Sequence, residues 1–253
     1  MMYERNRQTE LQIDLEAMEY NYNQIRKMHP DKEILPVLKA SGYGIGAKNV
    51  KKFLDKMKLR RVATAFVDEG VVLRAGLGYE GEIITLNQPS QGDINNIIEH
   101  DIVAGVCSLE FIKGLNNKAK RKGKNATIHI EIETGMGRTG VLLNELSDFL
   151  QELKGLDNIK TEGVYTHFAT SDSDIEFTYK QIENFNKAVE QIEEKLGKIK
   201  YIHTSNSAAI IRLSKITGNM VRPGIMLYGY YPSNELKENI KLKPCCVLKS
   251  KIS

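Results

Sequence analysis

A lysine ends a hydrophobic run near the start of the chain. In the segment ILPVLKASGYGIGA (34–47), Lys39 follows the apolar residues, and Tyr43 comes four residues later among glycines. An ammonium group buried in a strand must be paired or neutralised. A desolvated lysine has a lowered pKa, and its neutral amine can attack an aldehyde carbon. Lys39 is therefore a candidate for Schiff-base chemistry, and the alternative is a side chain that reaches the rim of the fold to form an ion pair.

Polar and cationic residues also follow other β-branched runs. The segments are TLNQ (85–88), ETGMGR (133–138), THFAT (166–170), HTSNS (203–207) and RPGIMLYG (222–229). They contain two arginines, two histidines and an Asn–Ser pair, whereas surface loops that serve solubility alone would be richer in Asp, Glu and Lys. This set of residues indicates a site for an anionic ligand.

The elements that must position these residues are short strands alternating with amphipathic helices. Strands are predicted at Glu33–Lys39, Val62–Val67, Glu82–Asn87, Ile102–Cys107, Thr127–Glu133, Thr161–Phe168, Lys200–Thr204 and Val221–Tyr228. Segments between them, such as FTYKQIENFNKAVEQIEEKLG (177–197), carry apolar residues at helical spacing. Strands that alternate with helices pair in parallel through right-handed crossovers. A doubly wound open sheet is the alternative, but eight such units in this length favour a closed (β/α)8 barrel, the TIM barrel.

The last two predicted strands end in segments that fit a phosphate. Ser207 lies where a helix begins after the seventh strand, so its hydroxyl and the local N–H groups would face an anion. Gly224 lets bare backbone approach an oxyanion closely. Taken alone, Ser207 would be an ordinary N-cap and Gly224 a turn glycine after Pro223. Their coincidence on neighbouring strands favours phosphate, as this fold commonly binds it there. A lysine facing a phosphate site suggests pyridoxal 5'-phosphate.

Composition limits the remaining classes of function. The chain has 253 residues and a net charge of +4, and its densest basic cluster, Asn116–Asn125, lacks the aromatic residues or fold motif of a nucleic-acid site. No apolar run approaches the roughly 18 residues of a membrane span. The polar N-terminus has no signal-peptide core. The three cysteines are odd in number and lack metal-ligand spacing, which predicts no metal site and a reducing, cytoplasmic setting.

The two ends of the chain do not fit the barrel pattern. LQIDL (11–15) would lie outside the barrel, before the helix LEAMEYNYNQIRKMH (15–29). After the eighth strand, CCVLKSKI (245–252) resembles a new strand with no partner left in the chain. It would either pack on the barrel or begin a second domain. We therefore expect a barrel in residues 1–232, and a connector with the first strand of a further β domain in residues 233–253.

Five separated motifs resemble those of alanine racemase and its fold-type III relatives. They are VLKASGYGIGA (37–47), IETGMGRTGV (132–141), GVYTHFATSDS (163–173), HTSNSAAII (203–211) and VRPGIMLYGY (221–230). One such segment would be weak evidence, but five in the family's order are highly specific. The resemblance implies a pyridoxal-phosphate-dependent enzyme that racemises an amino acid, alanine by default, for D-alanine biosynthesis. It also implies a homodimer for the full-length protein.

The resemblance assigns roles to residues at the matching positions. Lys39 would carry the cofactor as a Schiff base and act as one of two catalytic bases. Arg138 would lie near the substrate carboxylate. The phosphate would be held by Tyr43, Ser207 and the backbone of Gly224 and Ile225. His167 would lie against the cofactor ring and Arg222 would contact its nitrogen. Asn206 would lie beside the cofactor, and Leu86 would also bind it.

The assignment of Arg222 to the pyridine nitrogen has a chemical consequence. A guanidinium does not give up a proton in proteins, so the ring nitrogen that it faces stays unprotonated. The ring is then a weaker electron sink, which suits racemisation through a short-lived carbanion. A transaminase or a decarboxylase of this fold would place an acidic partner at that nitrogen.

The chain departs from the family's pattern at three places. Ser41, Gly42 and Ile45 replace an acidic or amide residue, an alanine and a histidine in the first motif. Glu131 stands where several relatives carry a carbamylated lysine, so it could supply negative charge to Arg138, or it could face outward from its strand. The catalytic tyrosine of the opposite face belongs to the family's second domain, and Tyr228, Tyr230 and Tyr231 do not match its motif.

Three rival interpretations stay open at this point. The first is a single-domain protein that binds pyridoxal phosphate without racemising. The second is a fold-type III decarboxylase, and the third is a barrel that binds a sugar phosphate. The motifs ETGMGR and RPGIMLYG favour the racemase, but the chain as given would racemise poorly or not at all without the second base.

Overall fold

Parallel strands form the centre of this computed structural model, which describes residues 9–251. Eight of the strands in that range follow the order β2-β10-β9-β8-β6-β5-β4-β3. They are β2 (Glu33–Ile34), β3 (Arg61–Thr64), β4 (Glu82–Thr85), β5 (Ile102–Val106), β6 (Ala126–Glu133), β8 (Ile159–Tyr165), β9 (Tyr201–His203) and β10 (Met220–Val221). A short strand, β7 (Val141–Leu142), pairs with the end of β6.

The ring of strands closes through the residues that follow β2. Val37 forms a parallel bridge with Ala63 of β3. The Leu38 amide donates to the Ala63 carbonyl at 2.7 Å, and the Ala63 amide donates to the Pro36 carbonyl at 2.8 Å. The prediction of a closed (β/α)8 barrel is therefore confirmed, and the open doubly wound sheet is excluded.

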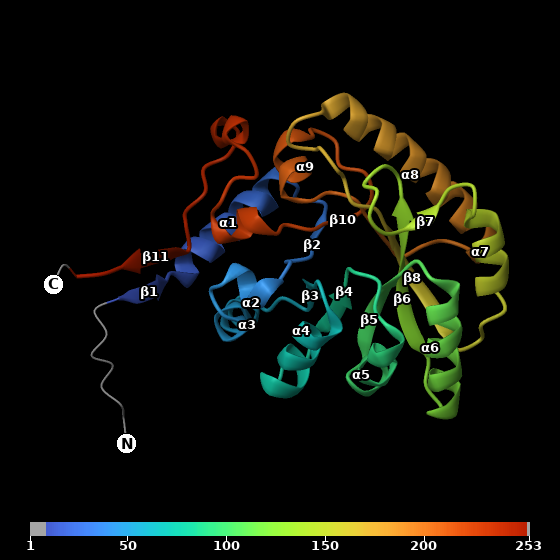
Figure 1. Ribbon diagram of the computed structural model, residues 1–253. Coiled ribbons are helices and arrows are strands. Elements are labelled where there is room, and N and C mark those ends of the chain that lie inside the picture. Colours follow the sequence, from blue (N-terminus) through green and yellow to red (C-terminus); the bar gives the residue numbers. More distant parts are fainter. Residues whose placement is uncertain (1–8, 252–253) are drawn as a thin grey trace, which may run out of the picture.

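Helices cover the outside of the ring (Figure 1). The principal helices are α1 (Leu15–Met28), α3 (Ala47–Lys56), α4 (Val67–Val71), α5 (Ile94–Glu99), α6 (Leu109–Arg121), α7 (Leu146–Leu153), α8 (Ile175–Leu196) and α9 (Ser207–Arg212). Shorter turns are α2 (Ala40–Tyr43), η1 (Val72–Gly76), η2 (Gln91–Asp93), η3 (Ile225–Tyr228) and η4 (Asn234–Glu238). The helix α8 buries Phe185 and Ile192 of the predicted stripe, and Asp174 caps its first turn by accepting from the Phe177 amide at 2.9 Å.

The barrel has two apolar layers, one outside the strands and one on the axis. The larger layer packs the strands against the helices. The smaller layer fills one part of the barrel interior with Leu35, Val37, Ala63, Ile84, Val103, Tyr201 and Met220. Because successive strand residues point to opposite faces, Ile83 belongs to the outer layer and Ile84 to the inner one. Buried polar side chains, among them His129, His203 and Arg222, lie inside the barrel as well.

Two predictions about strands need correction. The eighth strand was predicted at Val221–Tyr228, but β10 ends at Val221 and residues 225–228 form the 3-10 turn η3. Pro223 has no N–H for a ladder, and Gly224 leaves the extended conformation at ψ −105°. Terminal strand β11 (Cys246–Lys249) does have a partner, because it pairs antiparallel with β1 (Glu10–Ile13).

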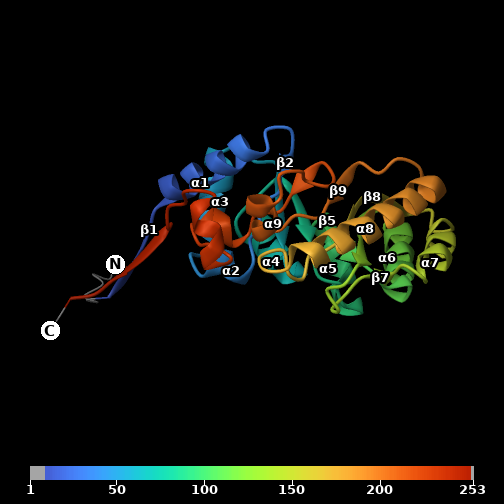
Figure 2. The ribbon, with the colours of Figure 1, turned by 90° about the horizontal axis from the view of Figure 1, so that it is seen from above.

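The β1–β11 pair projects from the barrel, as Figures 1 and 2 show. The segment LQIDL therefore lies outside the ring, as predicted. Both strands of this pair expose large apolar side chains, Leu11 on β1 and Leu248 on β11. None of the helices that the structure describes combines the length and the apolarity needed to span a bilayer.

Candidate functional site

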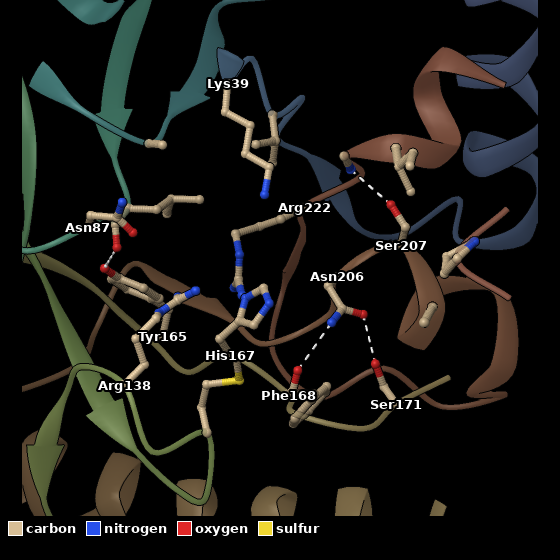
Figure 3. A pocket seen from close by; sticks show the side chains of 18 of the residues that line it. Lys39, Asn87, Arg138, Tyr165, His167, Phe168, Ser171, Asn206, Ser207 and Arg222 are labelled. Atoms are coloured by element: carbon tan, nitrogen blue, oxygen red, sulfur yellow. Dashed lines mark hydrogen bonds between the residues drawn. The ribbon is translucent and has the colours of Figure 1, made fainter. Parts of the chain in front are cut away.

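A cavity of about 510 Å³ opens at the carboxyl ends of the barrel strands. It falls in the size range of small-molecule and cofactor sites. Figure 3 shows side chains from several strand ends pointing into the same space. Every residue predicted for the site lines this cavity: Lys39, Tyr43, Leu86, Arg138, His167, Asn206, Ser207, Arg222, Gly224 and Ile225. Residues from six separate parts of the chain thus meet where the fold gathers its strand ends.

Lys39 is followed by one turn of left-handed helix, α2. Ala40, Ser41 and Tyr43 have φ angles of 49°, 54° and 52°, and Gly42 has 68°. The turn is closed by a bond of 2.8 Å from the Tyr43 amide to the Lys39 carbonyl. A left-handed conformation costs roughly 1–2 kcal/mol for each residue other than glycine. The turn must therefore be stabilised by its surroundings.

Glu69 of α4 supplies part of that stabilisation. Its Oε1 accepts from the Ala40 amide at 2.6 Å, next to Lys39. Its Oε2 accepts from the amides of Ala65 and Phe66 at 2.8 Å and 3.2 Å. One carboxylate therefore joins the loop after β2 to the loop after β3. Hydrogen bonds to a charged acceptor are stronger than those between neutral groups.

The side chain of Lys39 extends from this turn into the cavity. Its Nζ lies 5.5 Å from the centroid of the Tyr43 ring, and Figure 3 shows the amine directed toward Arg222. The residue is exposed. The predicted position at the mouth of the barrel is correct, whereas the predicted burial of the amine is wrong. Pairing between β2 and its neighbours stops before Lys39, so the chain leaves the barrel wall there.

The end of the cavity near Ser207 is built from hydroxyl groups and backbone. Ser207 Oγ accepts from the amides of Gly224 and Met226 at 3.0 Å and 3.3 Å. Any Cβ on Gly224 would lie 2.5 Å from the Tyr43 hydroxyl oxygen, so a larger residue there would displace that hydroxyl. The N-cap of α9 is Asn206, which accepts from the Ala209 amide at 3.1 Å. The capping explanation considered for Ser207 is therefore wrong, and its hydroxyl is available to the cavity end.

Arg222 is almost completely buried at the axis of the barrel, with 3% of its surface exposed. One terminal nitrogen, NH1, donates to the carbonyl and to Nδ1 of His203 at 2.7 Å and 3.0 Å. The other, NH2, donates to the carbonyls of Thr166 and Thr204 at 2.8 Å and 3.1 Å. Burial lowers the pKa of Arg222 to about 10. The guanidinium therefore stays charged near neutral pH and is compensated mainly by carbonyl dipoles.

Two further groups in the cavity have pKa values shifted by burial. Burial, and then the charges of Arg222, Arg138 and Lys39, lower the pKa of His167 to about 3, so its imidazole is neutral. Burial raises the pKa of Tyr43 to about 12, with a smaller contribution from Glu69. Both groups therefore meet a ligand in their uncharged forms.

Glu131 points into the cavity rather than outward from its strand. It is 2% exposed, and its Oε1 lies 4.0 Å from a terminal nitrogen of Arg138. Its Oε2 has no hydrogen-bond partner within residues 9–251. Burial raises the pKa of Glu131, while Arg138 and Arg222 oppose that shift. The outward orientation considered from the sequence is therefore excluded.

Arg138 lies on a glycine loop that a second glutamate holds. The carboxylate of Glu133 accepts from the amides of Gly137 and Arg138 at 2.9 Å and 3.3 Å, and also from the Gly135 amide. The Arg138 side chain is about half exposed. It can therefore reach a ligand that enters from the mouth of the cavity.

Two residues that support the site, Glu69 and Tyr165, were not predicted from the sequence. Glu69 acts on Lys39 through backbone amides, and a glutamate in the segment VDEG carries no signal for such a role. Tyr165 is buried beside the cavity, and its hydroxyl donates to the Leu86 carbonyl at 2.5 Å. Its position two residues before His167, within the strand predicted at Thr161–Phe168, is the signal that could have identified it.

Comparison with known proteins decides the family. Residues 13–232 match the family described as the alanine racemase N-terminal domain. The chain belongs to this family. The resemblance predicted from five motifs is thereby confirmed.

Relatives in this family align with nearly the whole chain. The alanine racemase of Carboxydothermus hydrogenoformans is 36% identical over 96% of the chain and 66% of its own length. That of Clostridium novyi is 39% identical over 99% of the chain and 65% of its own length. The solved structure of alanine racemase from Clostridium difficile 630 superposes with a TM-score of 0.91 at 38% identity, over 96% of the chain and 64% of that structure. The chain thus spans slightly less than two thirds of these relatives.

Proposed function

We propose that this chain is the cofactor-bearing part of a pyridoxal-phosphate-dependent amino acid racemase, and that alanine is its substrate. The observation that carries the proposal is the convergence of Lys39, Arg222 and the hydroxyl groups of Tyr43 and Ser207 on one cavity. Relatives named alanine racemase support the same activity. A barrel that binds a sugar phosphate would have no use for an amine opposite the phosphate end.

The residues fit the cofactor at its phosphate end. The missing side chain of Gly224 leaves backbone open beside two hydroxyl oxygens, since a Cβ there would lie 2.5 Å from that of Tyr43 and 3.8 Å from that of Ser207. Tyr43, Ser207 and the amides of Gly224 and Ile225 would hold the phosphate. Leu86, His167, Asn206 and Arg222 would contact the ring.

Different protein groups around that site would carry out different parts of racemisation. When bound, pyridoxal phosphate would supply an electron-withdrawing ring that acidifies the Cα–H bond of an amino acid. Lys39 would attach the cofactor, and its freed Nζ would then hold or return the proton on one face of the substrate. Arg138 would bind the substrate carboxylate.

The charge state of Arg222 would set the type of reaction. Its guanidinium donates hydrogen bonds and keeps its proton, so a ring nitrogen facing it receives no proton. The bound cofactor would then withdraw electrons from the substrate Cα less strongly than one with a protonated ring nitrogen. Arg222 would for this reason favour racemisation over transamination and decarboxylation.

A second proton-transferring group is needed on the opposite face, and the proposal assigns it to no residue of this chain. The hydroxyls of Tyr228 and Tyr231 donate to the carbonyls of Val37 and Ile240 at 3.0 Å and 2.9 Å, and neither tyrosine lines the cavity. We propose that residues 233–253, with β11 on β1, connect the barrel of residues 1–232 to a further domain. We also propose a homodimer and a role in supplying D-alanine.

The test is racemisation of L-alanine and L-serine by the chain, with and without its downstream sequence, after addition of pyridoxal phosphate. The proposal expects activity on alanine with the downstream sequence, and little or none without it. Cofactor binding with no racemisation in either form would favour the rival, a pyridoxal-phosphate-binding protein without racemase activity. Faster turnover of serine would correct the substrate.

A further inference from the structure

Three buried side chains form a hydrogen-bonded row inside the barrel, starting at Arg222. A terminal nitrogen of Arg222 lies 3.0 Å from Nδ1 of His203, and Nε2 of His203 lies 2.9 Å from Nδ1 of His129. Both histidines are 0% exposed. Arg222 lines the cavity, whereas His129 does not. His129 can therefore affect a ligand only through its neighbours.

The direction of these hydrogen bonds follows from the chemistry of arginine. A guanidinium can only donate, so Nδ1 of His203 must accept. A neutral imidazole has one N–H, which His203 then carries on Nε2 and donates to Nδ1 of His129. His129 in turn must carry its own proton on Nε2. That Nε2 has no hydrogen-bond partner within residues 9–251.

Both rings are neutral, as this arrangement requires. Burial lowers the pKa of His129 to about 3 and that of His203 well below its ordinary value, and the charge of Arg222 adds to both effects. A protonated His203 would direct an N–H at the guanidinium. The charged neighbour therefore excludes both the imidazolium and the other neutral tautomer.

The barrel wall is shaped to hold the outer ring of this row. A Cβ on Gly163 would lie 2.5 Å from Cγ and from Nδ1 of the His129 ring, so strand β8 leaves space only for glycine there. The register of β6 on β8 also shifts between Ile128 and His129. The His203 ring stacks on Tyr165, with centroids 5.0 Å apart and planes 10° apart. The two imidazoles are thus fixed by packing as well as by hydrogen bonds.

The row decides which N–H of Arg222 remains for a ligand. A guanidinium has five N–H donors. The two terminal nitrogens use four of them on His203, Thr166 and Thr204. None of the residues in the described part of the chain accepts from Nε. Figure 3 shows the side chain of Arg222 beside Lys39 and His167 in the cavity, where this remaining N–H can meet a ring nitrogen.

We propose that His129 is a positioning residue that accepts the Nε2–H of His203, holds that ring in place and, through it, fixes the direction in which Arg222 offers its Nε–H. The identity of the group that receives this N–H, the cofactor's ring nitrogen, rests on the proposed function. The tautomers themselves do not, because they follow from protein groups alone. His129 is thus a determinant of the site that lies outside the cavity.

The first test reads the tautomers directly. Long-range ¹⁵N–¹H correlation spectra of the ¹⁵N-labelled chain without cofactor distinguish the protonated from the bare nitrogen of each ring. The proposal predicts the Nε2–H tautomer for both His129 and His203 near neutral pH. An Nδ1–H tautomer or an imidazolium at His203 would overturn it. A chain with the predicted tautomers that fails to bind pyridoxal phosphate would refute the proposed function and leave the row intact.

The second test compares two substitutions at the same position. The amide oxygen of His129→Asn can occupy the place of Nδ1 and accept from His203, whereas His129→Phe fills the space and cannot accept. Because Arg222 imposes the Nε2–H tautomer of His203 in both variants, the readout is the hydrogen bond that this N–H donates. We expect the His203 Nε2–H proton to keep its downfield chemical shift in the asparagine variant and to lose it in the phenylalanine variant. Affinity for pyridoxal phosphate should fall at least severalfold in the phenylalanine variant only. Equal proton shifts of His203 Nε2–H and equal affinities in the two variants would contradict the proposal.

Discussion

Lys39 and Arg222 meet in one cavity, but the chain holds them in different ways. Lys39 follows β2 with an exposed side chain, and the four residues after it form a left-handed turn tied down by Glu69. Arg222 follows β10 with a buried side chain, and its terminal nitrogens donate to three carbonyls and one imidazole. Lys39 is thus fixed through the backbone that follows it, whereas Arg222 is fixed through its own side chain.

The difference corresponds to the role proposed for each group. An amine that attaches a cofactor and moves a proton needs a free side chain on a fixed backbone. A guanidinium that must stay protonated and point its N–H in one direction needs instead a side chain fixed by its contacts. The strain of the left-handed turn and the burial of the arginine are two separate costs, each associated with one function.

Of the substitutions considered, Lys39→Ala should cause the largest loss of activity. With the downstream sequence present, we expect alanine racemisation to fall by roughly 10³-fold or more, because both cofactor attachment and proton transfer are lost. The free energy of unfolding should change by less than about 0.5 kcal/mol, since the side chain is exposed. Lys48→Ala, an exposed lysine on α3, is the matched control. Equal losses in the two variants would contradict the role of Lys39.

Acid should lower the free energy of unfolding, because the two buried histidines beside Arg222 are neutral in the folded protein. His129 and His203 have pKa values lowered by burial, to about 3 for His129, whereas an unfolded histidine titrates near 6.5. Because the native pKa values are the lower ones, the unfolded chain binds more protons below pH 6.5. The stabilisation is complete above that pH and is lost as the pH falls, at about 1.4 kcal/mol per pH unit for each histidine.

Urea unfolding at several pH values checks this sign. The free energy of unfolding should be nearly constant between about pH 8 and pH 7 and should decline between about pH 6 and pH 5, the range just below the histidine pKa of the unfolded state. A constant value across the lower range would contradict the neutral buried pair.

Glu69→Gln should destabilise the left-handed turn that follows Lys39. The amide retains one acceptor oxygen and places an NH₂ group against backbone amides that the carboxylate now accepts from. We expect a loss of about 1–3 kcal/mol in the free energy of unfolding and slower reaction of Lys39 with pyridoxal phosphate. Asp68→Asn changes an exposed neighbour on the same helix and should leave both quantities unchanged. A Glu69→Gln variant as stable and as reactive as the parent would show that the turn does not depend on Glu69.

The smallest effect should come from Glu131→Gln. Since Glu131 Oε1 lies 4.0 Å from Arg138, removing its charge should loosen that arginine and raise the KM for alanine roughly two- to fivefold, with kcat little changed. Steady-state kinetics of the protein with its downstream sequence measures both constants. Glu162→Gln, a strand glutamate outside the cavity that pairs with Lys160, is the control. An unchanged KM would exclude this role for Glu131.

The barrel could be predicted from the sequence, and the ten residues predicted for the site do line the cavity, because local patterns and motifs carry both. Alternating strands and helices imply parallel pairing, and parallel strands bring their carboxyl ends together. Lys39, Arg138 and Arg222 could therefore be placed at one site from their positions after β-branched runs. Their motifs then supplied the roles.

What could not be predicted depends on contacts between distant residues. The role of Glu69 arises from backbone amides of two loops, and that of His129 from a ring held by Gly163 and His203. The apolar run of residues 225–228 has no period that separates a strand from a tight helix. The partner of β11 lies at the other end of the chain, where β1 alone gave no pairing signal.

The most direct test of the central claim is chemical. The chain is incubated with pyridoxal phosphate, reduced with borohydride and digested, and the modified lysine is identified by mass spectrometry. We predict one principal modified residue, Lys39, and loss of that product in the Lys39→Ala variant. Modification spread over surface lysines, with Lys39 no more labelled than Lys48, would contradict the account.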